Sequence, residues 1–450
     1  MYSKSFLVLA VMPLILLTEA SPYVLVLAIK GHACHSTIVN EKVAVCGWIE
    51  SEGKPSGFVA LVKDKKVEWF TLIKEVYELR KTVVLGDKLI VCGSRFIGSI
   101  KLSNGNLEWS YSSGAWLNDL AVLPDGKIFV CGVGYVALLD SSGKIIAEKA
   151  IEVVRSDGTS AKPFLFSLTV IEDRVVLAGA VFNVLSSSSG LDCLIVCMSI
   201  KDLKPLWAKC FGGKSHDRLY GVCSENGLIY VTGHTISRIL LRQETIVACF
   251  STSGEIKWCK VLFSKKWSYG ASIVSIKAVY VIGLAEGYGT EKTVFIAKIS
   301  PKSGSLLDSY EIKLGKYTTL TLGSHAEEVS GGVLVSCSNG SPLVIYWPLG
   351  FKGSFELEDK SDLVVEKSAF NSSSWNVLVK EVELSVSTEK VLFKKSFQVS
   401  RITVGAVKGG KLPVLEEKYK EKYLDLRLIL VALVCIAIIV LFLYRKFKKS

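Results

Sequence analysis

The chain has 450 residues, far more than one hydrophobic core needs, so it contains either several domains or one large repetitive domain. The formal net charge of +12 would suit a nucleic-acid-binding protein, but the basic residues are spread along the chain and are densest beside a C-terminal apolar segment, which argues against nucleic acid as a partner. Many Lys and Glu residues with few Gln and Met are typical of heat-adapted, archaeal-like proteins, although the twelve Cys count against this interpretation.

Residues 1–20 have the pattern of a secretory signal peptide. Lys4 precedes the apolar run "FLVLAVMPLILL", and small residues around Ala20 stand where a signal peptidase cleaves. Such a run is too short to cross a bilayer comfortably. We therefore expect the rest of the chain to be exported, with an uncleaved signal anchor as the alternative.

A short phrase that ends in Gly recurs along the chain. "VAVCG", "LIVCG" and "IFVCG" are followed by "VVLAG", "IYVTG" and "VYVIG", and a degenerate copy, "VLVSC", ends at Cys337. The six glycines are 46, 39, 47, 54 and 50 residues apart, and spacings in this range are typical of the four-stranded blades of a β-propeller. These glycines are Gly47, Gly93, Gly132, Gly179, Gly233 and Gly283.

Each copy lies between short alternating runs separated by turn residues, as in "LAVLPDGKIFVCG" and "TIVACFSTSGEIKW". Alternation with a period of two, broken by Gly-containing turns, predicts antiparallel strands joined by tight hairpins. The phrase is then the second of four strands, and we expect its Gly to let the backbone leave the sheet without strain. Seven blades are predicted between His35 and Asp359, and one blade more or fewer also fits the pattern.

The third hairpin of the repeat, for example "CFSTSGEIKW", resembles the Asp-x-x-Thr-Gly-x-x-x-Trp docking repeat of quinoprotein-like propellers. "LWAKCFGGKSHDRLYGV" is similar to the repeat of secreted prokaryotic and archaeal propellers in the WD40-like superfamily. The resemblance covers about residues 34–359 and implies a fold rather than an activity. It implies packing between neighbouring blades for the Trp residues at the docking position. These are Trp69, Trp109, Trp207 and Trp258, whereas Ala147 and Leu307 stand near that position in two other blades.

The flanking segments complete the predicted propeller, which spans residues 21–359. "YVLVLAI" over Tyr23–Ile29 precedes the first blade, and we expect it to close blade 7 as its outer strand. Residues 360–412 contain two alternating runs that do not fit the repeat. They predict an additional β segment, either extra strands or a small β module above a membrane.

The C-terminal residues predict a membrane anchor. Residues 413–427 begin with Pro413 and predict a helical stalk. The apolar residues 428–444 just cover a hydrocarbon core at about 1.5 Å per residue, and the basic residues 445–450 should stay in the cytoplasm. The expected fold class is therefore all-β, a seven-bladed propeller with a small additional β segment and a C-terminal transmembrane helix, with the propeller outside the cell.

The connections on the two faces of the predicted ring differ in length. The hairpins of one face are short and uniform, while the second-to-third connections of the other are long in blades 1, 4, 5 and 6 and minimal in blades 2 and 3. Loops on a rigid scaffold commonly carry function, so blades 4–6 form the candidate binding sector, with solvated loops that bind nothing as the alternative. Its candidate residues are Arg155, Lys214, His216, Arg218, His234 and Trp267.

Other chemistry is weakly indicated. "HACH" brings His32, Cys34 and His35 together, and imidazole and thiolate bind transition metals, but no second pair has ligand spacing. No cofactor is expected, because the adjacent Cys–Cys pair of the quinoprotein dehydrogenases is missing from the sequence. Cys197 and Cys210 flank one hairpin turn at nearly equal distance, which predicts a disulfide in an exported protein.

These patterns favour a membrane-anchored extracellular propeller that acts as a non-catalytic binding or scaffolding protein of the cell envelope. Its partner would be another envelope protein or a polysaccharide. The alternative is an ectoenzyme, quinoprotein-like or a hydrolase, with its site at the mouth of the propeller channel. Polar, ionisable residues that converge at the channel would favour the enzyme, and a patch bordered by loops would favour the binding protein. Asp119 and Asp217, which open first strands, are expected to hydrogen-bond between blades rather than to catalyse.

Overall fold

The structure, a computed structural model, describes residues 23–27, 30–63, 66–155, 157–185, 190–213, 216–236, 243–275, 277–287, 292–314, 321–329, 332–338, 342–348, 354–356, 362–367, 371–374, 378–387 and 399–400. The predicted signal peptide, stalk, transmembrane helix and basic tail lie outside these residues. Within the described part of the chain, no helix has the length and apolar composition needed to cross a bilayer.

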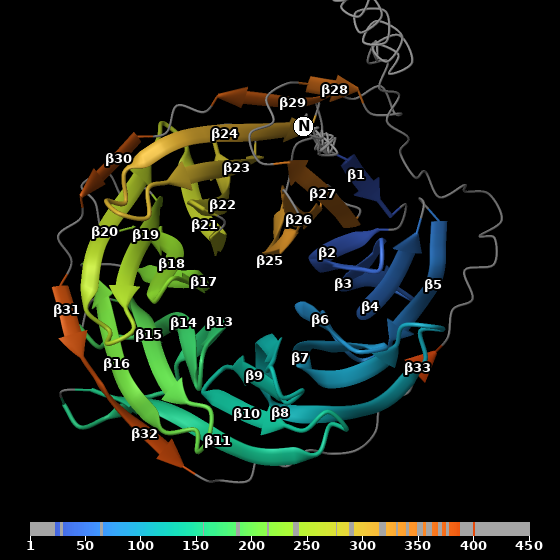
Figure 1. Cartoon of the computed structure of the whole chain (residues 1–450), viewed down its shortest axis with the longest axis horizontal. Helices are drawn as coiled ribbons and strands as arrows, with labels where there is room; N and C mark the ends of the chain where they lie inside the picture. The colour runs from blue at the N-terminus through green and yellow to red at the C-terminus, as the bar shows by residue number, and fades with distance from the viewer. Residues whose placement is uncertain are drawn as a thin grey trace, which may run out of the picture.

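Antiparallel sheets stand around a central channel like the blades of a propeller, and seven sets of four strands can be followed in the described residues (Figure 1). We call the strands of a blade A to D from the channel outward. Blade 1 contains β2 (Gly31–Val39), β3 (Lys42–Ser51), β4 (Lys54–Lys63) and β5 (Lys66–Ile73). Blades 2 and 3 share one sheet, which contains β6 (Lys81–Leu85), β7 (Lys88–Lys101), β8 (Leu107–Val122), β9 (Ile128–Gly132), β10 (Tyr135–Leu139) and β11 (Ile145–Val154), with the short β12 (Ser160–Ala161) beside β11.

The remaining blades are regular. Blade 4 contains β13 (Phe164–Ile171), β14 (Arg174–Phe182), β15 (Leu191–Ser199) and β16 (Pro205–Gly212), and blade 5 contains β17 (Asp217–Glu225), β18 (Leu228–Thr235), β19 (Glu244–Ser251) and β20 (Ile256–Phe263). Blade 6 contains β21 (Trp267–Ser275), β22 (Val279–Glu286), β23 (Lys292–Ile299) and β24 (Leu306–Leu314), and blade 7 contains β25 (Thr321–Val329), β26 (Gly332–Ser338), β27 (Pro342–Pro348) and β1 (Tyr23–Val26).

Blades 2 and 3 are continuous in one sheet because two strands each serve two positions. β7 pairs with β6 through its first half and with β8 through its second half, and Ser94, with a φ of 46°, lies between the halves. β8 pairs in turn with β7 and with β9. The minimal connections that the sequence shows in these blades therefore leave almost no loop between neighbouring strands.

The repeated glycine of strand B is required for space. Gly233 pairs with Leu219, and a Cβ on Gly233 would lie 1.7 Å from the carbonyl oxygen of Arg218. None of the repeated glycines has a positive φ. The expectation that they relax the backbone is therefore wrong: they let strand A approach strand B. The corresponding distances to a strand A carbonyl oxygen are 1.9 Å at Gly47, 1.9 Å at Gly132, 1.8 Å at Gly179 and 2.3 Å at Gly283, and the distance at Gly93 is 2.4 Å to the carbonyl oxygen of Glu78, just before strand A.

The Trp residues of strand D join neighbouring blades. The Nε1–H group of Trp207 in blade 4 donates to the carbonyl oxygen of Thr252 in blade 5, at 2.9 Å. Its indole lies over Gly254, where a Cβ would come within 2.8 Å of the ring. This is the contact between blades that the docking repeat implies. The other pairs are Trp69 with Gly105, Trp109 with Gly143, and Trp258 with Gly304.

β1 lies on the outer edge of blade 7, the place expected for Tyr23–Ile29. It pairs antiparallel with β27, with Tyr23 opposite Tyr346 and Val26 opposite Leu343. A strand from the start of the chain therefore completes the last blade, which joins the two ends of the ring and covers an open sheet edge.

The residues after blade 7 add outer strands around the ring. We call these strands the belt: β28 (Ser354–Glu356), β29 (Asp362–Lys367), β30 (Asn371–Ser374), β31 (Leu378–Glu381), β32 (Glu383–Ser387) and β33 (Val399–Ser400). β29 pairs with β24 of blade 6, β30 with β20 of blade 5 and β31 with β16 of blade 4. β32 then pairs with β11 of blade 3, and β33 with β5 of blade 1.

The belt thus follows the ring in the reverse of chain order, as the orange and red arrows outside the blades show (Figure 1). Of the two alternatives for residues 360–412, the described part forms extra strands, and a separate β module is the wrong expectation. The alternating run "VKEVELSVS" is divided between two blades, because β31 and β32 flank Val382, whose N–H group donates to Ala208.

The predicted disulfide between Cys197 and Cys210 is absent from the structure. A register shift in the hairpin places Cys197 opposite Trp207 and Cys210 opposite Leu194. Cys197 belongs to the apolar core between blades 4 and 5, and Cys210 to the core between blades 3 and 4. The two thiols therefore lie on opposite faces of the sheet, where no bond can form.

Candidate functional site

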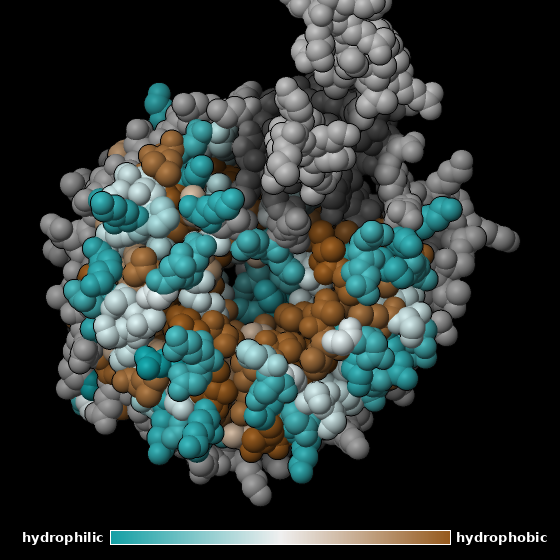
Figure 2. All heavy atoms as spheres, in the orientation of Figure 1, coloured by the Kyte–Doolittle hydropathy of each residue, from teal (hydrophilic) through white to brown (hydrophobic). Residues whose placement is uncertain are grey.

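The exposed aromatic residues of the described chain all lie on the face that carries the B–C and D–A connections. Tyr77 and Trp116 are 52% and 40% exposed and precede or open an inner strand, Trp267 (44%) opens β21, and Phe182 (41%) ends a strand B. The other exposed large apolar residues, such as Leu307 on strand D, are aliphatic. Figure 2 shows one face of the ring, which is hollowed at its centre with hydrophilic residues inside the hollow.

Strand A contains a bulge near the face that carries the B–C and D–A connections, which we call the mouth face. In blades 1, 3, 4, 5 and 6, strand A contains one extra residue directly after the residue that pairs with the strand B glycine. Bulges commonly re-aim side chains beside functional sites. The bulged residues are Cys34, Asn118, Phe166, Tyr220 and Ala271.

Aromatic side chains at or near these bulges form a row across blades 4, 5 and 6. Phe166 lies 5.3 Å from Tyr220, and Tyr220 lies 5.8 Å from Tyr269, between ring centroids. Phe164 lies 6.2 Å from Phe166 and 5.8 Å from Phe182. We call Phe182, Phe164, Phe166, Tyr220 and Tyr269 the aromatic strip.

Three predicted site residues gather beside this strip. Arg218 and His234 are cross-strand neighbours, and the His234 ring lies 5.5 Å from Tyr220. His216 accepts a hydrogen bond at Nδ1 from the Leu191 N–H group, at 3.3 Å. Burial, together with the charges of Arg218 and His216, lowers the pKa of His234 to about 3, so this imidazole is neutral at pH 7.

The other predicted residues of the sector are less closely connected. Arg155 donates through Nε to the carbonyl oxygen of Phe182, at 3.1 Å, which places it at the blade 4 end of the strip. Trp267 is on the same face but has no described contact with His216, Arg218 or His234. Lys214 lies outside the described residues.

The "HACH" residues do not converge as metal ligands. Cys34 is the bulged residue of β2, with its Sγ 3.8 Å from His32 Nδ1, whereas His35 is fully buried at the channel. Among the described residues no group of three His, Cys, Asp or Glu side chains is placed to hold a metal ion. Burial raises the pKa of the Cys34 thiol, which disfavours the thiolate that a metal needs.

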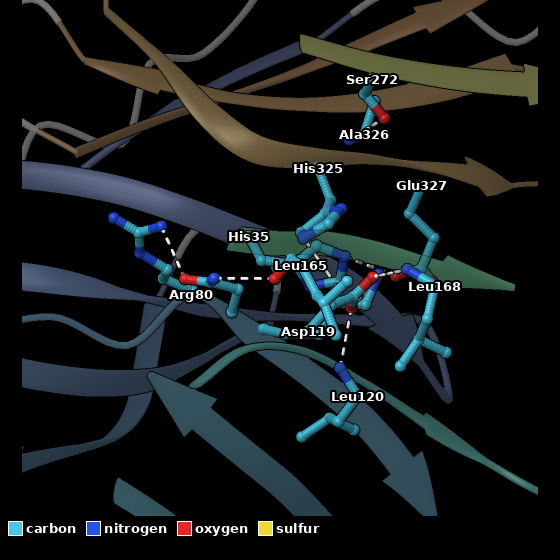
Figure 3. A network of polar contacts seen from close by, with 12 residues as sticks. His35, Arg80, Asp119, Leu120, Leu165, Leu168, Ser272, His325, Ala326 and Glu327 are labelled. Atoms are coloured by element: carbon cyan, nitrogen blue, oxygen red, sulfur yellow. Dashed lines mark hydrogen bonds and ion pairs between the residues drawn. The ribbon is translucent and has the colours of Figure 1, made fainter. Parts of the chain in front are cut away.

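Ionisable side chains from blades 1, 2, 3 and 7 meet at the centre of the ring (Figure 3). His325 Nε2 lies 3.7 Å from Asp119 Oδ1, across the channel between blades 7 and 3. His35 Nε2 lies 3.5 Å from Glu327 Oε2, and Lys81 Nζ lies 4.0 Å from Asp119 Oδ1. We call these five residues the channel cluster.

His325 reaches across the channel because strand A of blade 7 is irregular. Leu322 pairs with Cys337 and Ala326 with Val335, so three residues of β25 stand opposite one residue of β26. The other bulges contain one extra residue. At the start of this wider bulge, Cys337, which pairs with Leu322, stands where the other blades have the repeated glycine.

The carboxylates of the predicted aspartates are held by main-chain groups. Asp119 accepts hydrogen bonds from the N–H groups of Leu120 and of Leu168 in blade 4, both at 2.8 Å. Asp217 accepts from Gly213, at 2.6 Å, in the connection from blade 4. The expected bonding between blades is confirmed for Asp119.

The channel histidines are neutral near pH 7. Burial lowers the pKa of His325 to about 4 despite the opposing effect of Asp119, and burial and Lys81 lower that of His35. Burial also raises the pKa of Glu327. Neither ring nitrogen of His35 has a hydrogen-bond partner among the described residues. Solvent hardly reaches His35, Asp119 and His325, whereas the side chain of Glu327 is 31% exposed.

Sequence reasoning missed the aromatic strip and the channel cluster. Phe166 and Tyr220 alternate with apolar residues in strand A and look like core positions. The signal that could have found them is position: each stands one residue after the strand A residue that pairs with the repeated glycine.

No protein-family model and no curated protein matches the chain. Solved structures with similarity to it are β-propellers. BamB from Moraxella catarrhalis shares 12% identity over 68% of this chain and 82% of its own, with a TM-score of 0.42. The β-propeller domain of Cps50 (Swd1) from Myceliophteria thermophila shares 9% over 71% and 96%, with a TM-score of 0.46. A quinohemoprotein alcohol dehydrogenase from Pseudomonas putida shares 12% over 57% and 50%, with a TM-score of 0.36.

Proposed function

We propose that this protein is a non-catalytic binding protein of the cell envelope that holds its partner at the mouth of the propeller channel. The observation that carries the proposal is the gathering of every exposed aromatic residue of the described chain on the mouth face, where Phe182 belongs to the aromatic strip and Tyr77 and Trp116 contact each other in the sector of blades 1 to 3. Aromatic and Arg side chains supply much of the energy of binding interfaces, and exposed apolar patches commonly mark such interfaces.

The proposed location rests on the two ends of the sequence. A signal peptide over residues 1–20 and a single transmembrane helix over residues 428–444 would place the ring outside the cell and the basic tail inside. The partner is then another envelope protein or a polysaccharide, and nucleic acid is not expected.

The channel cluster favours a second candidate, an ectoenzyme, because acids and bases converge there as an enzyme requires. We prefer binding for two reasons. His35 and Asp119 are 0% and 2% exposed, so a substrate could not reach them without a rearrangement. Both oxygens of Asp119 are already bound by main-chain N–H groups, which suits a structural carboxylate.

A photo-cross-linking residue at Trp267 tests the proposal in intact cells. Trp267 is exposed at the mouth, whereas Leu307, 56% exposed on the outer strand D of blade 6, provides the matched control in the same blade. We expect the partner to be captured from position 267 and not from position 307. Equal capture at both positions, or capture at 307 alone, would place the interface elsewhere.

A further inference from the structure

We propose that the partner at the mouth is a carbohydrate chain, whose sugar rings stack on the aromatic residues and whose hydroxyl groups bind Arg218 and His234. This inference rests on the proposed function and names the chemical class of its ligand.

The aromatic strip is a continuous row of partly exposed rings, and the planes of neighbouring rings from Phe164 to Tyr269 differ by 11°, 49° and 59°. Consecutive ring centroids from Phe164 through Phe166 and Tyr220 to Tyr269 are 6.2, 5.3 and 5.8 Å apart. Sugar rings have apolar C–H faces, and aromatic rings that are apolar on their faces and polar at the tip suit a ligand with both kinds of surface. A row across three blades fits an extended chain of rings better than one compact molecule.

Buried polar atoms beside the strip lack partners. His234 is 5% exposed, and its Nδ1 atom has no hydrogen-bond partner among the described residues; the same holds for Nε of Arg218. Unpaired buried polar atoms are costly and rare in native proteins, so they commonly mark a bound group. A neutral imidazole can donate or accept, as a hydroxyl group can, and a guanidinium donates to a hydroxyl oxygen.

The strand edges argue against an extended peptide. In one common mode of recognition, an extended peptide pairs its main chain with a free sheet edge. The belt already pairs with strand D of blades 4, 5 and 6, and β1 with β27 of blade 7. In this sector the described strand D edges are therefore already paired, which disfavours this mode of peptide binding.

The test uses the full chain in detergent, with two probes from the envelope of the producing cell: oligosaccharides released by partial acid hydrolysis, and tryptic peptides. Binding is measured by calorimetry on the parent and on Tyr220→Leu, Arg218→Gln and Trp267→Ala. Tyr220→Leu leaves a smaller apolar side chain and removes the flat ring with its hydroxyl group. Leu307→Ala is the control at an exposed site on the outer strand, and melting temperatures verify that each variant folds.

We expect the oligosaccharides to bind the parent and the control with equal affinity. Tyr220→Leu and Arg218→Gln should each lower this affinity about tenfold or more. Peptides that bind, and lose affinity in Tyr220→Leu, would overturn the carbohydrate inference and leave the proposed function standing. Two results would overturn both the carbohydrate inference and the proposed function. One is an affinity that no mouth variant changes, and the other is no binding of either probe together with equal cross-linking at positions 267 and 307.

Discussion

Trp207 of blade 4 donates a hydrogen bond to the main chain of Thr252 in blade 5, at 2.9 Å from Nε1 to the carbonyl oxygen. The same contact joins Trp258 to Pro301 in blade 6 and Trp69 to Leu102 in blade 2, at 2.9 and 2.8 Å. Each indole therefore connects a strand D to the outer hairpin of the next blade. A ring built this way holds its inner strands in fixed positions, which the mouth requires if it is to bind a partner.

Removal of a docking indole should destabilise the ring. Trp69 is 8% exposed, and we expect Trp69→Ala to cost about 3–5 kcal/mol. Trp267→Ala removes the same side chain from a site that is 44% exposed and should cost about 0.5 kcal/mol or less. Urea midpoints measure both. Equal midpoints for the two variants would contradict the docking role.

A methyl group on a repeated glycine should be tolerated poorly. In Gly179→Ala the new Cβ would lie 1.8 Å from the carbonyl oxygen of Phe164, so strand A must move, and we expect a loss of about 3 kcal/mol or more. Gly53→Ala meets no atom within 4 Å and should cost about 1 kcal/mol for its φ of +74°. Thermal unfolding compares them, and a larger effect at Gly53 would refute the steric explanation.

The stability of the ring should fall on acidification. An unfolded His takes up a proton near pH 6.5, whereas His234 and His325 stay neutral in the fold to about pH 3 and 4. Between these values the unfolded chain binds more protons, so the free energy of unfolding decreases as the pH falls. Glu327, whose pKa burial raises, acts in the opposite direction. We expect the melting temperature to drop between pH 7 and pH 4.5, and His234→Gln to drop less; identical pH profiles would exclude this cause.

The path of the belt can be tested by a disulfide. Glu152 in β11 and Ser385 in β32 are cross-strand partners, so Glu152→Cys with Ser385→Cys should form a bond under oxidising conditions. Ser374 pairs with Lys260 in blade 5, so Glu152→Cys with Ser374→Cys should not. Mass spectrometry of the linked peptides reads the result. A bond in the second pair alone would show that the belt takes another path.

The blades could be predicted because one period of the sequence contains a complete hairpin pattern, and because Gly233 and its equivalents mark the same position in each. The belt could not, since β30 to β33 pair with residues more than a hundred positions away and its alternating runs look like a local hairpin. Val382 between two belt strands carries no turn signal in its sequence.

The candidate site was predicted in part. His216, Arg218 and His234 come together because each lies at the loop end of an inner strand of blade 5 or just before it, which the loop pattern reveals. The place of Tyr220 in the site could not be predicted, because a bulge at Tyr220 reverses the side-chain alternation after it. No residue type in the sequence indicates such a bulge. His325 was missed because blades 7 and 3 meet only across the channel, so no local pattern relates His325 to Asp119.

The central claim, that the mouth over blades 4–6 holds the partner, is tested most directly by recovery of the bound partner on the full chain from detergent-solubilised envelope. The parent is compared with Tyr220→Leu and with Leu307→Ala, all verified as folded. We expect the parent and Leu307→Ala to retain the same partner, and Tyr220→Leu to retain about one tenth as much or less. Equal retention by all three proteins would contradict this claim.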